Sequence, residues 1–172
     1  MNHDDSHIAQ FNLARARAPL NDPSMYGFTS QLLRINRLAD NSPGFVWRLQ
    51  TEDGDATAIR AYPEDESLLL TLSVWERIED LVEFSYRGEH ATVMRDRAQW
   101  FHHIEETYIV LWWIPVGHIP SLEEAKERLA FLRCHGPTPR AFTFKVQFSL
   151  EEAEASPGEG EEVAAGKQSL KI

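Results

Sequence analysis

The sequence predicts an α+β fold, a ferredoxin-like antiparallel sheet with helices on one face. Strand-type patterns, either alternating or apolar on both faces, occur over 68–75 and 107–116. Apolar residues recur every three or four positions, as in amphipathic helices, over 25–39, 78–85 and 122–132. Because these segments are interleaved in one chain of 172 residues, we expect a single domain whose element order resembles a ferredoxin-like sandwich with additions.

The residues before position 40 predict a first strand and a first helix. Residues 7–15 alternate, with Gln10 and Asn12 on the same face. The side chains of these two amides either point into the interior, where each needs a hydrogen-bond partner, or lie at a solvent-exposed edge of the sheet. A helix is expected to begin at Pro23, after an Asn-Asp pair that offers an N-cap. Its buried side chains are expected to be Met25, Phe28, Leu32, Ile35 and Ala39.

The middle of the chain predicts a hairpin followed by a strand and a helix. Strands over 45–50 and 56–62 flank the turn sequence TEDGD, whose Asp-Gly pair favours a tight reversal. The next strand, 68–75, is mainly apolar on both faces. The period changes to that of a helix at Ile78, and Gly88 is placed to end this helix.

A further helix is predicted over 89–101, and it carries two ionisable residues inside an apolar face. His90 and Arg97 lie near the middle of that face, about 10 Å apart along the helix axis. A polar group in such a place costs free energy unless a partner satisfies it. Either both side chains bond to carbonyls or carboxylates of the fold, or they reach a ligand cavity under the helix.

The C-terminal part predicts a strand, a helix and a last short strand. The strand over 107–116 is apolar on both faces and needs cover on two sides. Ser121 and Glu124 form a capping-box pattern for a helix that ends at Gly136. The last strand is expected over 141–148.

The domain is expected over residues 8–148, between a polar lead of residues 1–7 and an acidic disordered tail of residues 149–172. Helices of these lengths are expected to cover only one face of the sheet. The other face, which carries alternate side chains of the strands near Leu68 and Thr107, would be a large exposed apolar patch. We therefore expect a homodimer in which two sheets pack face to face.

Composition argues against several classes of partner. A net charge of -10 does not favour nucleic acid or an anionic membrane. The single Cys134 excludes an intrachain disulfide and a cysteine-rich metal site, and we expect it to pack as a small apolar residue. The longest apolar run, 108–116, falls short of the roughly 18 residues that span a bilayer. Without an apolar signal segment, a cytoplasmic location is expected.

The remaining histidines are assigned mainly to surface roles. The pair at 102–103, with two glutamates nearby, is expected in a solvated turn and not at a metal ion. His118 follows a glycine at a strand end, where it either serves a ligand site or has a capping or surface role. His135 is expected to interact with free carbonyls in the last turn of its helix. The sequence contains no GxGxxG, GxxxxGK[ST], GxSxG or HExxH motif, so no nucleotide, metal or other cofactor is expected.

Three blocks of sequence carry a family resemblance: LSVWERIEDLVEFSYRGEHATVMRDRAQWF, YIVLWWIPVGHIPSLEEAKERL and HGPTPRAFTF. With them, the chain resembles the bacterial family called domain of unknown function 3291 over about residues 8–144. The resemblance implies membership of the dimeric α/β-barrel superfamily, which also holds antibiotic-biosynthesis monooxygenases and haem-degrading monooxygenases. It thus implies the same homodimer.

The resemblance implies two arrangements of site residues. Some haem-degrading members use an Asn on the first strand, a Trp after the third strand and a His on the next helix, and Asn12, Trp75 and His90 occupy loosely similar positions. Cofactor-free members bind a polyketide-like aromatic in a pocket lined by Trp, Arg and amide side chains. The candidates for that pocket are Asn12, Trp75, Arg97 and Trp100.

The expected function is that of a small-molecule enzyme resembling cofactor-independent monooxygenases or isomerases. It would act on an apolar or aromatic substrate between the sheet and the helices. His90 would serve as general base, and Arg97 would stabilise the resulting anion. The expected substrate-binding residues are Asn12, Trp75, Met94, Trp100 and His118. The alternative is a non-catalytic module that holds a small apolar ligand, and haem binding through His90 is the least favoured hypothesis.

Overall fold

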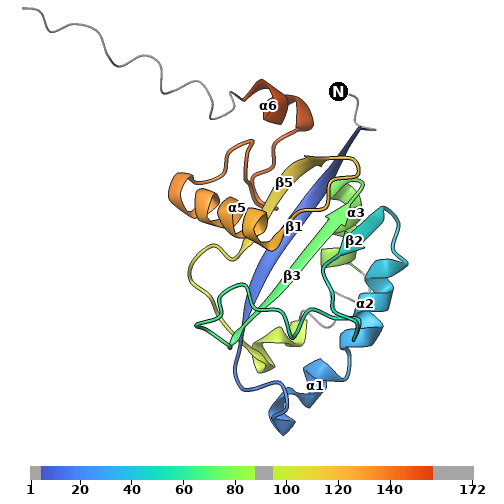
Figure 1. Cartoon of the computed structure of the whole chain (residues 1–172), viewed down its shortest axis with the longest axis vertical. Helices are drawn as coiled ribbons and strands as arrows, with labels where there is room; N and C mark the ends of the chain where they lie inside the picture. The colour runs from blue at the N-terminus through green and yellow to red at the C-terminus, as the bar shows by residue number, and fades with distance from the viewer. Residues whose placement is uncertain (1–4, 88–94, 157–172) are drawn as a thin grey trace, which may run out of the picture.

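The computed structural model describes residues 5–87 and 95–156, and it confirms the α+β class and the antiparallel sheet (Figure 1). The strands of the sheet are β1 (Ser6–Ala16), β2 (Phe45–Arg48), β3 (Leu68–Trp75), β4 (Phe101–His102) and β5 (Ile109–Pro115). Every pairing between them is antiparallel.

Strand β1 is the centre of the sheet. It pairs with β3 on one side and with β5 on the other, while β4 lies beside its C-terminal end and β2 pairs with β3. Leaving out the short β4, the chain follows the order β-α-β-β-α-β of a ferredoxin-like fold. In this register Gln10 faces Ser73 and Asn12 faces Thr71 across the β1–β3 pair, which places these four residues on one face.

The helical segments follow the predicted periodicity, with one division. The helix expected from Pro23 onward is split into a 3-10 turn and two helices, because Gly27, Thr29 and Ser30 are weak helix formers. Asp22 caps the first turn through a hydrogen bond to the backbone N–H of Ser24. The segments are η2 (Pro23–Met25), α1 (Tyr26–Thr29), α2 (Leu32–Asp40), α3 (Ile78–Tyr86), η3 (Arg97–Gln99), α5 (Leu122–His135) and α6 (Leu150–Ala155).

Helices lie on both faces of the sheet. Helices α2 and α3, which follow β1 and β3, share one face, as expected for a ferredoxin-like fold. Helix α5 and the loop of residues 56–62 lie on the opposite face (Figure 1). The expectation that all helices share a face was therefore wrong for α5, because the apolar stripe of a helix does not specify which side of a sheet it packs on.

The cover provided by α5 removes the argument for a dimer through this face. Phe11, Leu72 and Trp112 all point to α5 and are at most 1% exposed within the single chain. The apolar side chains that fill this layer are Ala9, Phe11, Leu13, Leu72, Val74, Val110, Trp112, Ile114, Ala125, Leu129 and Leu132. The chain itself covers the surface that a second copy was expected to cover.

Two predicted strands are replaced by loops. Residues 56–62 do not return as the partner of β2, which pairs with β3 instead. The intervening loop satisfies its polar groups locally, since the Thr51 N–H donates to the carbonyl of Asp55 and the Asp55 carboxylate accepts from Thr57. The strand expected over 141–148 is reduced to two isolated bridges, between Leu111 and Phe142 and between Thr138 and Ala141.

Several boundaries also differ from the sequence-based expectations. Of the helix expected over 89–101, residues 88–94 lie outside the described part of the chain, Arg97–Gln99 form a 3-10 turn and Phe101 belongs to β4. The expected tail begins with helix α6, in which Ser149 and Glu152 form a reciprocal capping box. Cys134 is exposed and not packed in the core. His135 contacts the carbonyl oxygen of Phe131 at 3.0 Å, which confirms its role at the helix end.

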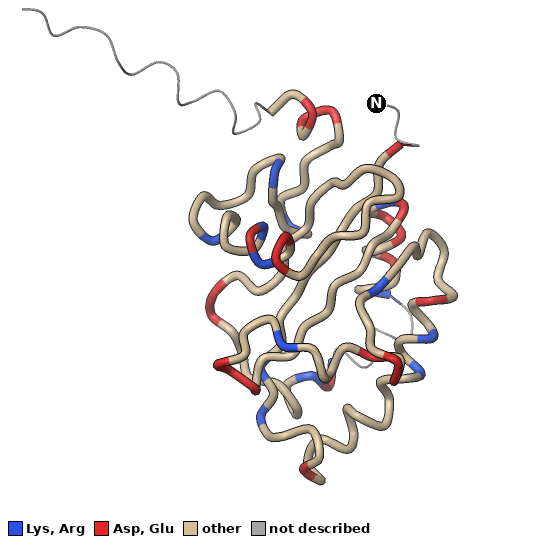
Figure 2. The backbone as a smooth tube through the Cα atoms, in the orientation of Figure 1, with Lys and Arg blue, Asp and Glu red and all other residues tan. Residues whose placement is uncertain are grey.

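The charged residues are spread over the molecule. Lys and Arg are scattered among Asp and Glu over the molecule (Figure 2), and pairs such as Arg15–Asp65 and Arg77–Asp80 neutralise each other locally. Such interspersion is ordinary for a globular surface. Within residues 5–87 and 95–156, no helix has the length and hydrophobicity needed to cross a membrane.

Candidate functional site: a cavity above the sheet

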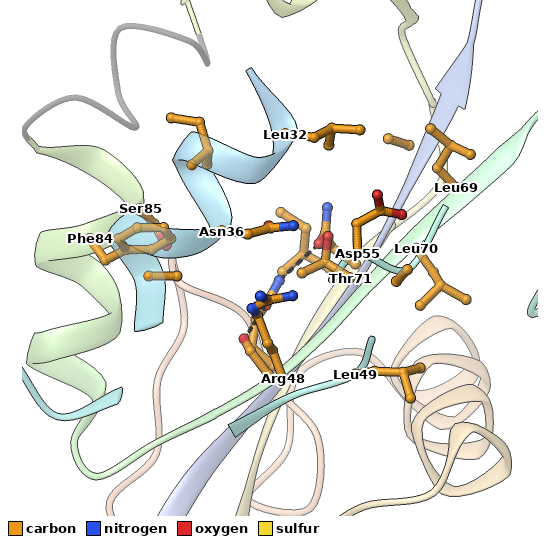
Figure 3. Close-up of a pocket in the computed structure, with 18 of the residues that line it drawn as sticks. Leu32, Asn36, Arg48, Leu49, Asp55, Leu69, Leu70, Thr71, Phe84 and Ser85 are labelled. Atoms are coloured by element: carbon orange, nitrogen blue, oxygen red, sulfur yellow. Dashed lines mark hydrogen bonds between the residues drawn. The ribbon is translucent and has the colours of Figure 1, made fainter. Parts of the chain in front are cut away.

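A cavity of about 360 Å³ lies on the face of the sheet that carries α2 and α3. Its floor is formed by β1 and β3, through Gln10, Asn12, Ala14, Leu69, Thr71 and Ser73. Its walls include Leu32, Ile35 and Asn36 of α2, Phe84 and Ser85 of α3, Arg48 at the end of β2, and Asp55 of the loop that follows β2 (Figure 3). This volume falls within the range of about 300–1,000 Å³ that is usual for small-molecule pockets.

The floor stays open because small and polar residues occupy the middle of two central strands. Thr71 is exposed although it lies within β3, and Asn12 opposite it is half-buried. A larger apolar residue at either position would fill the space beneath α2. The cavity is therefore a consequence of local residue choice on β1 and β3.

A chain of hydrogen bonds runs across the floor. The indole Nε1 of Trp75 donates to the hydroxyl of Ser73 at 3.1 Å, and this hydroxyl donates to Oε1 of Gln10 at 3.0 Å. The amide Nε2 of Gln10 then donates to Oδ1 of Asn12 at 3.1 Å. Trp75, Ser73 and Gln10 are each less than 9% exposed, so Gln10 has the interior position that was one of its two alternatives. We call these four residues the floor relay.

Arg97 and two tyrosines form a cluster at the cavity. The guanidinium carbon of Arg97 lies 5.5 Å from the ring centroid of Tyr108, which is a cation–π arrangement. Burial is the main cause that raises the pKa of Tyr86, Tyr108 adds to the rise, and the charge of Arg97 opposes it. Tyr86 is 57% exposed, and its hydroxyl, like that of any tyrosine, is protonated at neutral pH and can donate a hydrogen bond. Tyr86, Arg97 and Tyr108 all line the cavity.

A second polar group lies on the wall formed by the end of β2 and the loop that follows it. Arg48 binds the carboxylate of Asp40 through Nε at 2.7 Å and the carbonyl of Gly54 through a terminal nitrogen at 2.9 Å. Asn36 donates to the same carbonyl at 3.2 Å. Figure 3 shows Asn36, Arg48 and Asp55 gathered in the middle of the view, close to Thr71.

Asp55 is a site residue that the sequence reasoning missed. Its Oδ1 accepts from the backbone N–H of Thr57 at 2.8 Å and from the Thr57 hydroxyl at 2.6 Å. The hairpin expected over this segment placed Asp55 in a surface turn. The Asp-x-Thr spacing at 55–57 was a signal for such a local turn and against a return strand.

The structure brings four of the seven predicted site residues to one cavity. Asn12, Trp75, Arg97 and Trp100 all line it. Trp75 and Trp100 are 1% and 6% exposed, so they act as walls packed into the core. His90 and Met94 lie outside the described residues, and the roles assigned to them, including haem ligation by His90, stay predictions.

His118 lies away from the cavity. Its Nε2 contacts Oε2 of Glu124 at 2.7 Å, near the start of α5 on the opposite face of the sheet. Only half of the predicted capping box forms there: the Ser121 hydroxyl accepts from the Glu124 N–H, while the Glu124 carboxylate turns to His118 and Trp112. The position of His118 does not fit the expectation that it binds substrate in this cavity. The position fits the alternative, a capping or surface role.

Removal of the Glu124 carboxylate is expected to destabilise the protein. The Nε1–H of Trp112 donates to Glu124 Oε1 at 2.9 Å, and Trp112 is 0% exposed. The Glu124→Ala variant leaves this buried donor without its acceptor, so we expect a loss of about 1–3 kcal/mol in the free energy of unfolding. Urea denaturation measures the loss. Glu124→Gln retains an acceptor oxygen and serves as the control, and equal losses in the two variants would contradict the assigned role.

Comparison with known proteins gives one match. A family model with the description Domain of unknown function (DUF3291) matches residues 7–158. No curated protein and no solved structure shows a significant match. The match spans nearly all of the sheet, the helices on both of its faces and the cavity. The chain therefore belongs to the family described as Domain of unknown function (DUF3291).

Proposed function

We propose that this protein binds a small, mainly apolar or aromatic molecule in the cavity above the sheet and acts on it as an enzyme resembling cofactor-independent monooxygenases or isomerases. The observation that carries the proposal is a cavity of about 360 Å³ with aromatic and aliphatic walls and an ordered polar floor. Apolar walls with a few fixed polar groups are typical of small-molecule sites. The ferredoxin-like order of elements supports a relation to the dimeric α/β-barrel superfamily of antibiotic-biosynthesis monooxygenases.

The chemistry proposed for the cavity is removal of a proton from a phenolic or enolic substrate. The base takes the proton, and the electron pair of the broken bond becomes negative charge on the substrate oxygen. Arg97 lines the cavity and is placed to stabilise that charge. In an isomerisation the proton taken from the oxygen is delivered to a carbon of the same anion. In a monooxygenation that carbon reacts with dioxygen as co-substrate: one oxygen atom becomes a carbonyl on the carbon and the other leaves as water with two hydrogens of the substrate, so the substrate is oxidised and dioxygen is reduced.

Two residues are candidates for the base. His90 is the residue expected from the sequence. Asp55 is the one carboxylate among the described residues that line the cavity, and its Oδ1 is fixed by Thr57. The second candidate function is a non-catalytic module that holds a small apolar ligand, and the mainly aromatic and aliphatic walls of the cavity favour it.

Filling the cavity tests the binding proposal. We expect 1-naphthol to quench tryptophan fluorescence, since Trp75 and Trp100 line the cavity. Thr71→Phe places a ring over the open floor and should weaken the affinity at least tenfold while the protein stays folded. Thr107→Phe, at an exposed position outside the lining, is the matched control and should bind as the original chain does. Equal affinity in all three proteins would remove the cavity as the site.

Turnover separates the two candidate functions. Phenolic and enolic naphthalenes would be screened for protein-dependent product formation and oxygen uptake. Loss of a general base lowers rates by about 10²–10⁴-fold, so Asp55→Asn should abolish detectable turnover if Asp55 is the base. Binding of these compounds without any turnover would favour the non-catalytic module.

A further inference from the structure

The hydrogen bonds of the floor relay specify which kind of polar group a ligand must bring. We infer that the ligand places an acceptor oxygen, of a carbonyl, carboxylate or phenolate group, against the amide NH₂ group of Asn12, and that Trp75 imposes this preference through Ser73 and Gln10. The inference rests on the proposed function, because it describes the ligand of the same cavity.

The direction of the relay follows from the chemistry of its first member. An indole N–H can only donate a hydrogen bond, so the Ser73 hydroxyl accepts from Trp75 at 3.1 Å. The hydrogen of this hydroxyl then needs an acceptor, because Ser73 is 6% exposed. Oε1 of Gln10 lies 3.0 Å away and provides it.

The orientation of Gln10 in turn orients Asn12. With Oε1 directed at Ser73, the NH₂ group of Gln10 faces Asn12 and donates to its Oδ1 at 3.1 Å. Asn12 therefore turns its own NH₂ group elsewhere, and Asn12 lines the cavity. Flipping both amides would keep a hydrogen bond between them, with Asn12 now the donor, but it would turn the NH₂ group of Gln10 toward the Ser73 hydroxyl and leave the buried Ser73 hydrogen without an acceptor. Such a group is costly to leave unsatisfied.

Other donors line the same cavity. The Thr71 side chain lies opposite Asn12 in the β1–β3 register, is exposed to the cavity and makes no hydrogen bond to the residues that the structure describes. The guanidinium of Arg97 and the hydroxyl of Tyr86 also line it. A ligand that carries acceptor oxygens therefore meets complementary groups, whereas a purely apolar ligand leaves the floor donors without partners.

Three naphthalenes of similar shape test the inference. 2-Acetylnaphthalene carries a neutral acceptor oxygen, 2-naphthoate carries an anionic one, and 2-ethylnaphthalene carries none. We expect the protein to bind the first two about tenfold more tightly than the third, which corresponds to one additional hydrogen bond. Dissociation constants would be measured by tryptophan quenching and by isothermal titration calorimetry.

Variants of the floor assign the preference to Asn12. Asn12→Asp replaces the donor by an acceptor of the same shape. It should abolish the preference for 2-acetylnaphthalene over 2-ethylnaphthalene and weaken the affinity for 2-naphthoate still further. The affinity for 2-ethylnaphthalene should not change. Asn21→Asp makes the same chemical change at an exposed residue outside the lining and is the control. If Asn12→Asp fails to fold, Thr71→Val provides the test. This substitution removes a hydrogen-bond donor from the cavity floor with little change of volume. It should therefore reduce the ratio of the affinity for 2-acetylnaphthalene to that for 2-ethylnaphthalene.

The positioning role of Ser73 has its own readout. Ser73→Ala should bring the affinity ratio of 2-acetylnaphthalene to 2-ethylnaphthalene toward one, since Gln10 is then free to flip. A purely structural role would lower both affinities alike and leave the ratio unchanged. Equal binding of all three probes, unaffected by the Asn12 and Thr71 variants, would overturn the inference and leave the proposed function standing. If none of the probes binds, 2-ethylnaphthalene included, the proposed function fails and the inference fails with it.

Discussion

The Trp75→Ala variant is expected to lose about 3–5 kcal/mol in the free energy of unfolding. Trp75 is 1% exposed, and its ring lies between Phe45, at a centroid distance of 5.3 Å, and Phe84, at 5.1 Å. Its removal takes away a large buried surface, leaves a void beside the existing cavity and breaks the first hydrogen bond of the floor relay. Chemical denaturation followed by circular dichroism measures the loss.

Trp113 provides a control on the same face of the sheet. It faces Ile8 across the β1–β5 pair, as Trp75 does across the β1–β3 pair, but it is only half-buried. Its Nε1 donates to the carbonyl of Phe148 at 2.9 Å. We expect Trp113→Ala to lower the free energy of unfolding by less than Trp75→Ala does. A Trp75 variant as stable as the original chain would mean that this ring is not part of the core.

The Ser73→Ala variant is expected to lose about 2–6 kcal/mol in the free energy of unfolding, a large effect for the removal of one oxygen atom. The change leaves two buried groups without partners, the Nε1–H of Trp75 and Oε1 of Gln10, and each costs about 1–3 kcal/mol. The free energy of unfolding from urea titration gives the loss. Ser30→Ala, at an exposed position, is the control and should change stability by less than about 0.5 kcal/mol.

A double-mutant cycle tests whether this loss of unfolding free energy arises from the hydrogen bonds of the floor relay. Trp75→Phe keeps an aromatic ring but removes the N–H, so Ser73→Ala in that background leaves only Gln10 without a partner. The second substitution should therefore cost less in the Trp75→Phe protein than in the original chain. Strictly additive losses would indicate that the two side chains are not coupled.

The elements set by local periodicity could be predicted from the sequence. Alternation over 7–15 and the apolar strands near Leu68 and Thr107 correspond to β1, β3 and β5, and the pattern of Ser121 and Gly136 delimits α5. The side of the sheet on which α5 packs could not be predicted, because an apolar stripe is compatible with either face. The expected dimer depended on that choice.

The candidate site was predictable in part, for a similar reason. Asn12 was singled out as a polar residue inside a strand, which is a local signal, and it does line the cavity. Asp55 and Thr71 gave no comparable signal, since their place in the cavity depends on the β1–β3 register and on a loop that replaces the expected strand. The hydrogen bond between Ser73 and Gln10 joins residues 63 positions apart in the sequence and emerges only from the pairing of two strands.

The central position of β1 has a consequence for biosynthesis. Ile8 is paired with both Trp75 and Trp113, so β1 meets its second neighbour, β5, only after about a hundred further residues have been synthesised. Contacts of such long sequence separation slow folding. Until β5 emerges, one edge of an apolar strand is open to other nascent chains, and chaperone dependence is expected to fall once translation passes that strand.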